Sequence, residues 1–361
     1  MTRPLFTPVG VDYGLPTQVH CNDTILTVTE FSPDKSDRPL FLLTIDTEEE
    51  WDWHGNFPTP PFSTGNIEQI PQFQKLCDDM GIRPTYFVNH AVADNLNNVR
   101  LLRNFLDRGE CDIGAHLHPW CTPPIIEDIG EENSHAVNLP LSLFEQKLQV
   151  LTENLTGAFG CHPYSYRAGR WGVNGDHLRS LAKMGYRVDS SVRPFYEDNY
   201  FSYKKALTFP YWPSFDDVLK IDETQKSLFE VPTSSGFDRT PFELLDTLHT
   251  KLSTKPLNQL RLIGILWRLR ILRKITVTPE GHDASDICRC IDACVARGDR
   301  IINMFFHSSD LLPGCTPYVQ NDVEKQRFLD CIKRCVEHLT SVHNAEFVTM
   351  REIRQRLTGA A

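Results

Sequence analysis

Two short segments of the sequence carry pairs of histidines or carboxylates separated by one residue. His116 and His118 lie in GAHLHPW, and Asp46 and Glu48 lie in TIDTEEEW. Successive side chains of an extended strand point to opposite faces, so the two members of each pair share a face. Two imidazoles and a carboxylate can hold a zinc ion and leave a position open for water. The residue types predict a hydrolytic metal site; the alternative is a pair of histidines on a polar strand face.

The two carboxylates can divide the chemistry between them. One can bind the metal while the other takes a proton from water as general base. Asp46 directly follows the apolar run FLLTI, and a carboxylate at the end of a buried strand needs a partner, for which an arginine is suited. We expect Arg167 in YRAGRWG to be that partner, with Arg170 as the alternative. For Glu49 and Glu50 we expect a solvated loop.

Three further residues could complete such a site. His307 ends the apolar run INMFFH, where a general acid could protonate a leaving amine; a structural histidine is the alternative. Asp189 in VDSSV could hold an imidazole in one tautomer, or it could cap a turn. Trp171 lies beside glycines in YRAGRWG and could form a platform for a sugar ring, or it could be a core aromatic.

The elements that position these residues alternate between strand-like and helix-like segments. Short apolar runs predict strands at 39–46, 84–89, 111–120, 164–172 and 300–310. Segments with helical spacing separate several of them, which indicates βα units and a parallel sheet. In such sheets the ligand site lies at the carboxyl ends of the strands. The polar residues that end the apolar runs are Asp46, His116, Arg167, Asp189 and His307.

The length of 361 residues allows one large domain with insertions. We expect an N-terminal arm over 1–38 and a single barrel domain over 39–355. Pro-rich and irregular stretches predict insertions at about 121–140 and 195–285, which would shape substrate choice at the same end of the barrel.

Composition excludes several other classes of protein. Net charge is −10, which makes a general electrostatic attraction to nucleic acid unexpected. The sequence has no apolar run of 18 residues and no secretory signal after its basic start, so we expect a cytoplasmic protein. Eleven cysteines lack the pattern of a disulfide framework. The closest three, Cys288, Cys290 and Cys294, have the spacing of a helix core.

The segment 257–274, LNQLRLIGILWRLRILRK, contains five basic residues, no acidic residue and several large apolar ones. This composition suits a helix lying on an anionic membrane surface. An ordinary helix packed on the barrel is the alternative. The first interpretation would place the protein at the inner face of the membrane, acting on lipid-linked sugars.

The order of these motifs resembles that of the polysaccharide deacetylase family, also called NodB-homology domains or family-four carbohydrate esterases. The likeness spans about residues 38–350, in short motifs. It implies a distorted (β/α)7 barrel with loop insertions, a divalent metal, and removal of acetyl groups from sugars. The metal would be zinc, with cobalt or nickel as alternatives.

Carried over by motif, the resemblance makes Asp46 the catalytic base, Arg167 the residue that orients it and His307 the general acid. The implied metal ligands are Glu48, His116 and His118. The implied substrate contacts are Trp120, Arg170, Trp171 and Asp189. Two positions depart from the family pattern. Trp120 stands where a second histidine is usual, and Thr47 stands where many members have a metal-binding aspartate.

These inferences predict a hydrolase that removes N-acetyl or related acyl groups from an amino sugar or glycan. One alternative is a glycan-binding relative that kept the cleft and lost catalysis. Another is an amide hydrolase of the allantoinase or amidohydrolase type, since amidohydrolases also carry a His-x-His pair on a barrel strand.

Overall fold

The computed structural model describes residues 18–21, 24–27, 38–53, 55 and 57–359. Most of the predicted N-terminal arm, 1–38, lies outside the described residues. Within it, β1 (Gln18–Cys21) and β2 (Thr24–Thr27) form an antiparallel pair.

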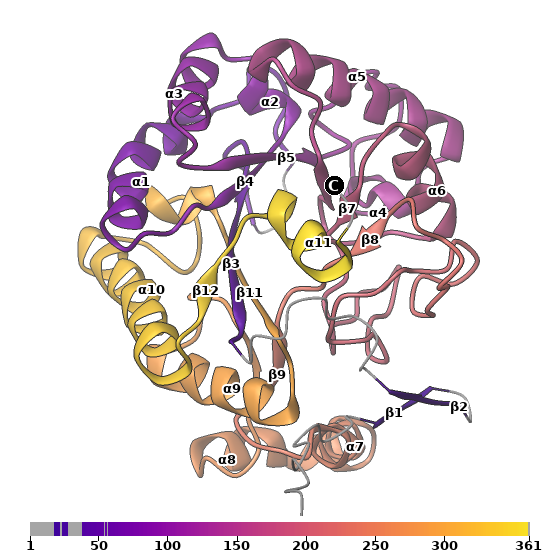
Figure 1. The fold of residues 1–361 in the computed structure, drawn as a ribbon, viewed down its shortest axis with the longest axis vertical. Coiled ribbons are helices and arrows are strands. Elements are labelled where there is room, and N and C mark those ends of the chain that lie inside the picture. The colour runs from indigo at the N-terminus through magenta and orange to yellow at the C-terminus, as the bar shows by residue number, and fades with distance from the viewer. Residues whose placement is uncertain (1–17, 22–23, 28–37, 54, 56, 360–361) are drawn as a thin grey trace, which may run out of the picture.

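A curled parallel sheet forms the centre of the molecule (Figure 1). Its strands in spatial order are β11 (Ile301–His307), β3 (Leu40–Thr47), β4 (Thr85–Val88), β5 (Asp112–Leu117), β6 (Ser165–Ala168), β7 (Val188–Asp189) and β8 (Phe229–Glu230). A short strand, β12 (Glu346–Phe347), also pairs with β3, at Leu40 and Phe41. All of these pairings are parallel. The predicted distorted (β/α)7 barrel is therefore confirmed.

Side chains and irregular backbone join the two edge strands of this sheet, β8 and β11. The Ser234 amide donates to the Asn303 carbonyl at 3.0 Å, and the Asn303 amide donates to Ser234 Oγ at 2.9 Å. Asn303 Nδ2 also donates to the Pro232 carbonyl at 3.2 Å. Asn303 belongs to β11, so these bonds fix the strand whose last residue is His307.

Helices surround the sheet (Figure 1). The outer helices are α1 (Ile70–Asp79), α3 (Leu96–Asp107), α5 (Leu141–Phe159), α6 (Gly175–Lys183), α9 (Ala284–Arg297) and α10 (Asp322–His343). Their apolar residues recur at helical spacing; in α5, for example, Phe144, Leu148, Leu151 and Leu155 are all buried. Cys290 and Cys294 are buried in the core face of α9, as their spacing predicted.

The segments predicted as insertions contain short elements. In 121–140 these are α4 (Glu131–Ser134) and a 3-10 helix (Ala136–Asn138). In 195–285 they are the sheet strand β8, an antiparallel pair of β9 (Ser235–Phe237) and β10 (Lys274–Thr276), and, between these two strands, the helices α7 (Phe242–Ser253) and α8 (Leu262–Arg268). A further short helix, α2 (His90–Ala93), follows β4.

The last helix, α11 (Met350–Thr358), closes the barrel interior at the amino ends of the strands. Met350 and Ile353 pack with Leu42, Phe87 and other buried side chains of the strands. Thr349 and Glu352 form a capping box that fixes the start of this helix. These side chains fill the barrel interior at the amino ends of the strands.

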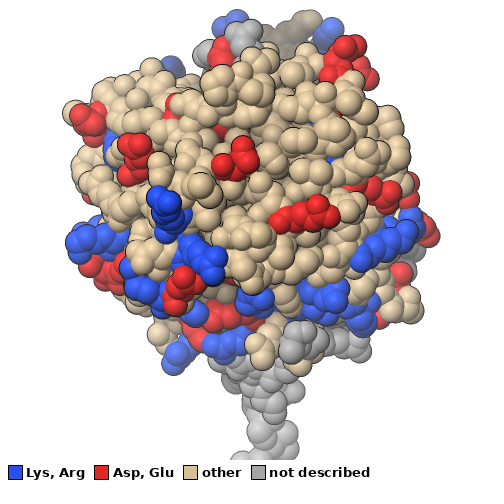
Figure 2. Space-filling view, turned by 90° about the horizontal axis from the view of Figure 1, so that it is seen from above, with Lys and Arg blue, Asp and Glu red and all other residues tan. Residues whose placement is uncertain are grey.

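Charges of both signs are interspersed on the face shown in Figure 2, and the basic ones gather toward one edge. Within the described part of the chain, the helices are too short or too polar to cross a bilayer. In the segment 257–274, the apolar side chains of Leu260, Ile265, Leu269 and Ile271 are exposed.

Candidate metal centre and active site

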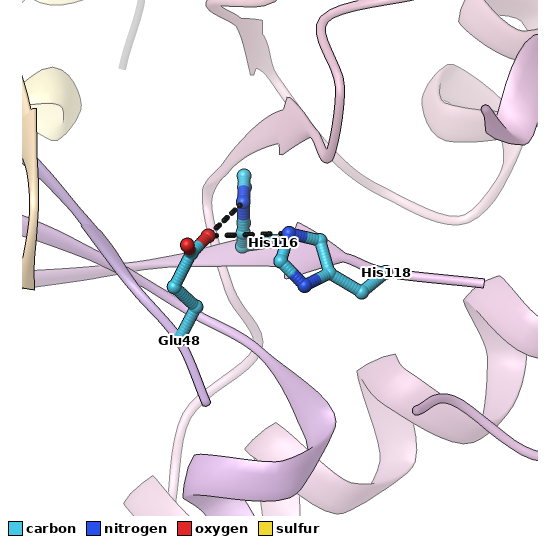
Figure 3. Close-up of side chains that lie close together, drawn as sticks. All are labelled: Glu48, His116 and His118. Carbon is cyan, nitrogen blue, oxygen red and sulfur yellow. Dashed lines mark ion pairs between the residues drawn. The ribbon is translucent and has the colours of Figure 1, made fainter. Parts of the chain in front are cut away.

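Glu48, His116 and His118 lie together at the carboxyl ends of β3 and β5 (Figure 3). Glu48 Oε2 is 3.2 Å from Nε2 of His116 and 3.2 Å from Nε2 of His118. All three side chains are buried. The strand alternation predicted from the sequence thus brings these three residues to one point.

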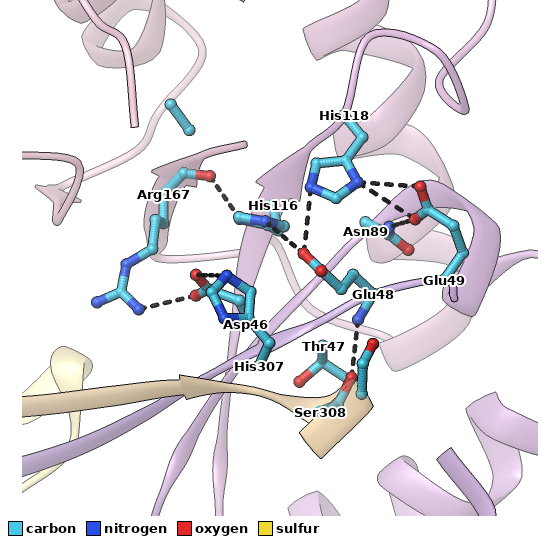
Figure 4. Close-up of polar contacts among 12 residues, drawn as sticks. Asp46, Thr47, Glu48, Glu49, Asn89, His116, His118, Arg167, His307 and Ser308 are labelled. Carbon is cyan, nitrogen blue, oxygen red and sulfur yellow. Dashed lines mark hydrogen bonds and ion pairs between the residues drawn. The ribbon is translucent and has the colours of Figure 1, made fainter. Parts of the chain in front are cut away.

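The outer nitrogen of each imidazole already has a hydrogen-bond acceptor (Figure 4). His116 Nδ1 lies 3.0 Å from the Arg167 carbonyl, and His118 Nδ1 lies 3.0 Å from Glu49 Oε1. When Nδ1 donates, the lone pair of a neutral ring is on Nε2, which faces Glu48 in both residues. Two nitrogen lone pairs and a carboxylate oxygen therefore converge, and this donor set fits a divalent cation such as zinc.

Electrostatics ties the three residues together. Burial alone would raise the pKa of Glu48, but the neighbouring charges of His118 and His307 and hydrogen bonds from His116 and His118 hold this pKa well below its usual value. Burial opposes protonation of His118, yet Glu49 and Glu48 raise its pKa to about 9. Glu48 is therefore ionised beside a protonated His118, and a metal ion that bound here would displace the proton from His118 Nε2.

Asp46 forms a buried ion pair with Arg167 across the barrel. Arg167 Nη1 donates to Asp46 Oδ1 at 2.8 Å, and both side chains are fully buried. The same guanidinium donates from Nε to the Ser190 carbonyl and from Nη2 to Thr44 Oγ1, each at 3.0 Å. Arg167 is therefore the partner of Asp46, as predicted. Arg170 pairs with Glu131 at 2.6 Å instead.

His307 faces the second oxygen of Asp46. Its Nε2 lies 3.7 Å from Asp46 Oδ2, and its Nδ1 lies 2.7 Å from Glu280 Oε1. Burial lowers the pKa of His307, but Glu280, Glu48 and Asp46 outweigh it and raise this pKa to about 10. The imidazole therefore stays protonated at neutral pH and can donate a proton from Nε2.

These groups face a cavity of about 410 Å³. Its lining includes the candidate metal ligands Glu48, His116 and His118, and also Asp46 and His307. The aromatic side chains of Trp51, Trp53, Trp171, Tyr196 and Tyr318 line it as well. A cavity of this size with aromatic walls and a few converging polar groups is typical of small-molecule sites.

Comparison with known proteins bears on the fold. No family model matches the sequence, and no curated protein is similar to it. A protein of Mycobacterium smegmatis assigned as a polysaccharide deacetylase is 15% identical, with a TM-score of 0.53 over 90% of this chain and 92% of the other. This chain has the polysaccharide deacetylase fold.

Two further solved structures are also similar to this chain. Puue allantoinase is 14% identical, with a TM-score of 0.52 over 91% of this chain and 92% of the other. A family 4 acetyl xylan esterase from Clostridium thermocellum, solved with a cobalt ion, is 12% identical, with a TM-score of 0.42 over 89% and 93%. The polysaccharide deacetylase fold is thus shared with a protein named as an allantoinase.

The sequence analysis did not predict that two carboxylates, Glu49 and Glu280, contact the histidines of the site. Glu49 is completely buried, so the expectation of a solvated loop was wrong for this residue. It accepts hydrogen bonds from Asn89 and from Trp120 Nε1 while it holds His118. Glu280 holds His307 from the segment 195–285. Glu49 lies in a run of three glutamates and Glu280 in a long irregular segment. Neither segment has a periodicity that would indicate which side chain is buried.

Trp120 and Asp189 do not line the cavity, so the geometry gives no support to their predicted contact with substrate. Trp120 is buried, because its ring stacks on His118 with centroids 4.1 Å apart while its Nε1 donates to Glu49 at 2.5 Å. Arg170 and Trp171 do line the cavity, and their contact with substrate stays a prediction.

Asp189 pairs with Glu230 on the neighbouring strand β8, and no imidazole is its partner in the described residues. Asp189 also accepts a hydrogen bond from Ser191 Oγ at 2.7 Å, and Glu230 accepts one from the Val192 amide at 3.1 Å. Burial raises the pKa of both carboxyl groups. A hydrogen bond between them requires that one keep its proton.

Glu230→Gln is therefore expected to stabilise the protein at pH 8. The folded-state pKa of the pair is raised, so the folded protein retains a proton that the unfolded chain releases above its ordinary carboxyl pKa, and stability falls as pH rises. The NH₂ group of Gln donates this hydrogen bond at every pH. The free energy of unfolding at pH 8 should therefore rise by about 1 kcal/mol. Urea unfolding between pH 5 and pH 8 would measure it; an equally steep decline in both proteins would contradict the shared proton.

Glu280→Gln is expected to move the alkaline limb of kcat/KM to lower pH. The Gln oxygen can still accept from His307, but the loss of negative charge lowers the pKa of His307, now about 10. The protonated form that donates a proton is then lost at lower pH. A rate profile from pH 6 to pH 11 would show this. Asp283→Asn, an exposed carboxylate in the same loop, is the control; an unshifted limb in Glu280→Gln would remove His307 as the acid.

Proposed function

We propose that this protein is a metal-dependent hydrolase that removes an N-acetyl or related acyl group from an amino sugar of a polysaccharide or lipid-linked glycan. One observation carries the proposal: Asp46 Oδ2 and His307 Nε2 lie 3.7 Å apart and line one cavity with the cluster of Glu48, His116 and His118. This arrangement combines a base, an acid and a metal site, which are the groups that hydrolysis of an unreactive amide needs.

Glu48, His116 and His118 would hold the cation, with zinc favoured and cobalt or nickel as alternatives. When bound, it supplies Lewis-acid polarisation of the acyl carbonyl. Asp46, oriented by Arg167, accepts a proton from the water that attacks the acyl carbon. His307 then donates its Nε2 proton to the departing nitrogen as the carbon–nitrogen bond breaks. The products are a carboxylic acid and a free amine.

The aromatic walls support a sugar substrate. The lining includes Trp171, Tyr196, Trp51 and Trp53, and sugar rings stack their apolar faces on such side chains. A second candidate is hydrolysis of a cyclic amide, because the fold is also that of Puue allantoinase. A glycan-binding protein without catalysis is the third, and it predicts no turnover.

Release of acetate by the purified protein loaded with zinc, cobalt or nickel tests the proposal. Substrates should include N-acetylated free sugars, nucleotide-linked and lipid-linked amino sugars, and allantoin. Acetate release that a chelator abolishes and metal restores is expected. Turnover of allantoin alone would favour the second candidate, and binding of glycans without turnover would favour the third.

We also propose a cytoplasmic location at the inner face of the membrane. The support is the segment 257–274, in which exposed apolar side chains such as Leu260, Ile265 and Leu269 alternate with arginines. Such a surface suits anionic lipid. Liposome flotation tests this: recovery with acidic but not neutral vesicles is expected, and equal recovery with both would contradict it.

A further inference from the structure

Arg193 is a cation without a carboxylate partner on the wall of the catalytic cavity. It follows β7, at the same end of the barrel as the metal cluster. Within the described residues, its guanidinium makes neither an ion pair nor a hydrogen bond that would neutralise it. The two other arginines of this region differ, since Arg167 is paired with Asp46 and Arg170 with Glu131.

Aromatic rings hold the Arg193 guanidinium in place. Its central carbon lies 4.5 Å from the ring centroid of Tyr196, 5.2 Å from that of Phe305 and 5.5 Å from that of Trp171. These contacts restrict the side chain and remove part of its hydration. A positioned, partly dehydrated guanidinium gains more from an anion than one in water does.

A second cavity, of about 610 Å³, lies on the other side of Arg193 and Tyr196, which line both cavities. Two lysines, Lys204 and Lys274, and His249 also line it. Lys204 is paired with Glu197 at 2.5 Å. Lys274 donates only to the Phe195 carbonyl among the described residues, so its charge is not neutralised by an ion pair.

The balance of charge in this second cavity is positive. Burial lowers the pKa of Lys274, and the nearby cations Lys204 and Arg193 lower it further, while Asp246 and Glu197 act in the opposite direction. Cations that repel each other across a cavity are stabilised together when an anion lies between them.

We propose that the junction of the two cavities binds an anionic group of the substrate, with Arg193 as the main contact and Lys274 as the second. The substrate is then an acylated amino sugar that carries a phosphoryl or carboxylate group, with its acyl end in the catalytic cavity and its anionic end toward the second cavity. This inference rests on the proposed function and narrows its substrate class.

The first test compares substrates that differ in charge. N-acetylglucosamine is neutral, N-acetylglucosamine 1-phosphate carries a phosphoryl group, and N-acetylmuramic acid carries a carboxylate. Wild-type kcat/KM should be higher for one of the charged sugars, which identifies the group. In Arg193→Gln the ratio of charged to neutral kcat/KM should fall by about 30-fold, the effect of a charge-assisted hydrogen bond. Arg193→Lys should lie between the two.

The matched control is Arg187→Gln, at the opposite end of β7, where the guanidinium donates to the Tyr186 carbonyl. It should keep the wild-type ratio. An unchanged ratio in Arg193→Gln would overturn the inference while leaving hydrolysis itself intact.

A binding measurement separates this inference from the proposed function. Titration of the metal-loaded protein with inorganic phosphate by calorimetry should show binding that Arg193→Gln weakens by about 10-fold or more and Arg187→Gln does not. This result without turnover of any sugar would reject the proposed function and keep the anion site. Equal titration curves for wild type and Arg193→Gln, whether or not phosphate binds, would overturn the site.

Discussion

Asp46→Asn is expected to lower kcat about 10³- to 10⁴-fold, because the amide cannot take the proton of the attacking water. The proposed metal ligands are Glu48, His116 and His118 and do not include Asp46, so metal content should remain at the wild-type level. Acetate release and metal content, measured on the same preparation, check both statements.

Loss of Asp46 also leaves the buried Arg167 without its carboxylate, which costs stability. Asp112→Asn is the matched control, since Asp112 is a buried aspartate that accepts from Arg351 at the amino end of β5. It should also lose stability, through loss of its ion pair with Arg351, and it should keep its activity. Wild-type turnover in Asp46→Asn would remove Asp46 from the mechanism, and equal loss of turnover in both variants would trace the effect to folding.

Glu48→Gln is expected to abolish both metal binding and turnover. Glutamine keeps an oxygen for the hydrogen bond that Trp51 Nε1 makes to Glu48 at 3.0 Å, so the fold around it should persist. It lacks the negative charge that balances a cation between two buried imidazoles. Loss of a residue that only hydrogen-bonds a metal ligand lowers metal affinity by up to about 100-fold. Loss of the ligand charge in Glu48→Gln should lower it further. Calorimetric titration with zinc measures this affinity.

Glu50→Gln is the control, because Glu50 lies two residues further and bonds to Ser63 Oγ and the Asn66 amide, each at 2.7 Å, outside the cluster. It should bind zinc as the wild type does. Turnover by Glu48→Gln at the wild-type rate without bound metal would overturn the metal-dependent mechanism.

The central residues of this site could be predicted from the sequence because strand geometry determines where their side chains lie. His116, His118, Asp46 and Glu48 stand at or just beyond strand ends, where alternation and parallel packing determine which side chains meet. The Arg167–Asp46 pair followed from the cost of burying an isolated carboxylate.

Residues whose positions depend on loops could not be predicted in this way. Glu49 is buried against His118 Nδ1, and the ring of Trp120 stacks on that of His118. Glu280 reaches His307 from a segment whose path no periodicity defines. Asp189 was predicted at the end of an apolar run and does end β7, but its partner is Glu230 on β8, a two-residue strand too short to be recognised by pattern.

The position of α11 has a consequence for how the protein is made. This helix supplies Met350 and Ile353 to the interior of a barrel whose first strand, β3, starts at Leu40. A ribosome must therefore synthesise more than 300 residues after the first barrel strand before that interior can close. During translation the apolar side chains of the strands remain exposed and accessible to chaperones. The barrel is completed only after α11 has been synthesised.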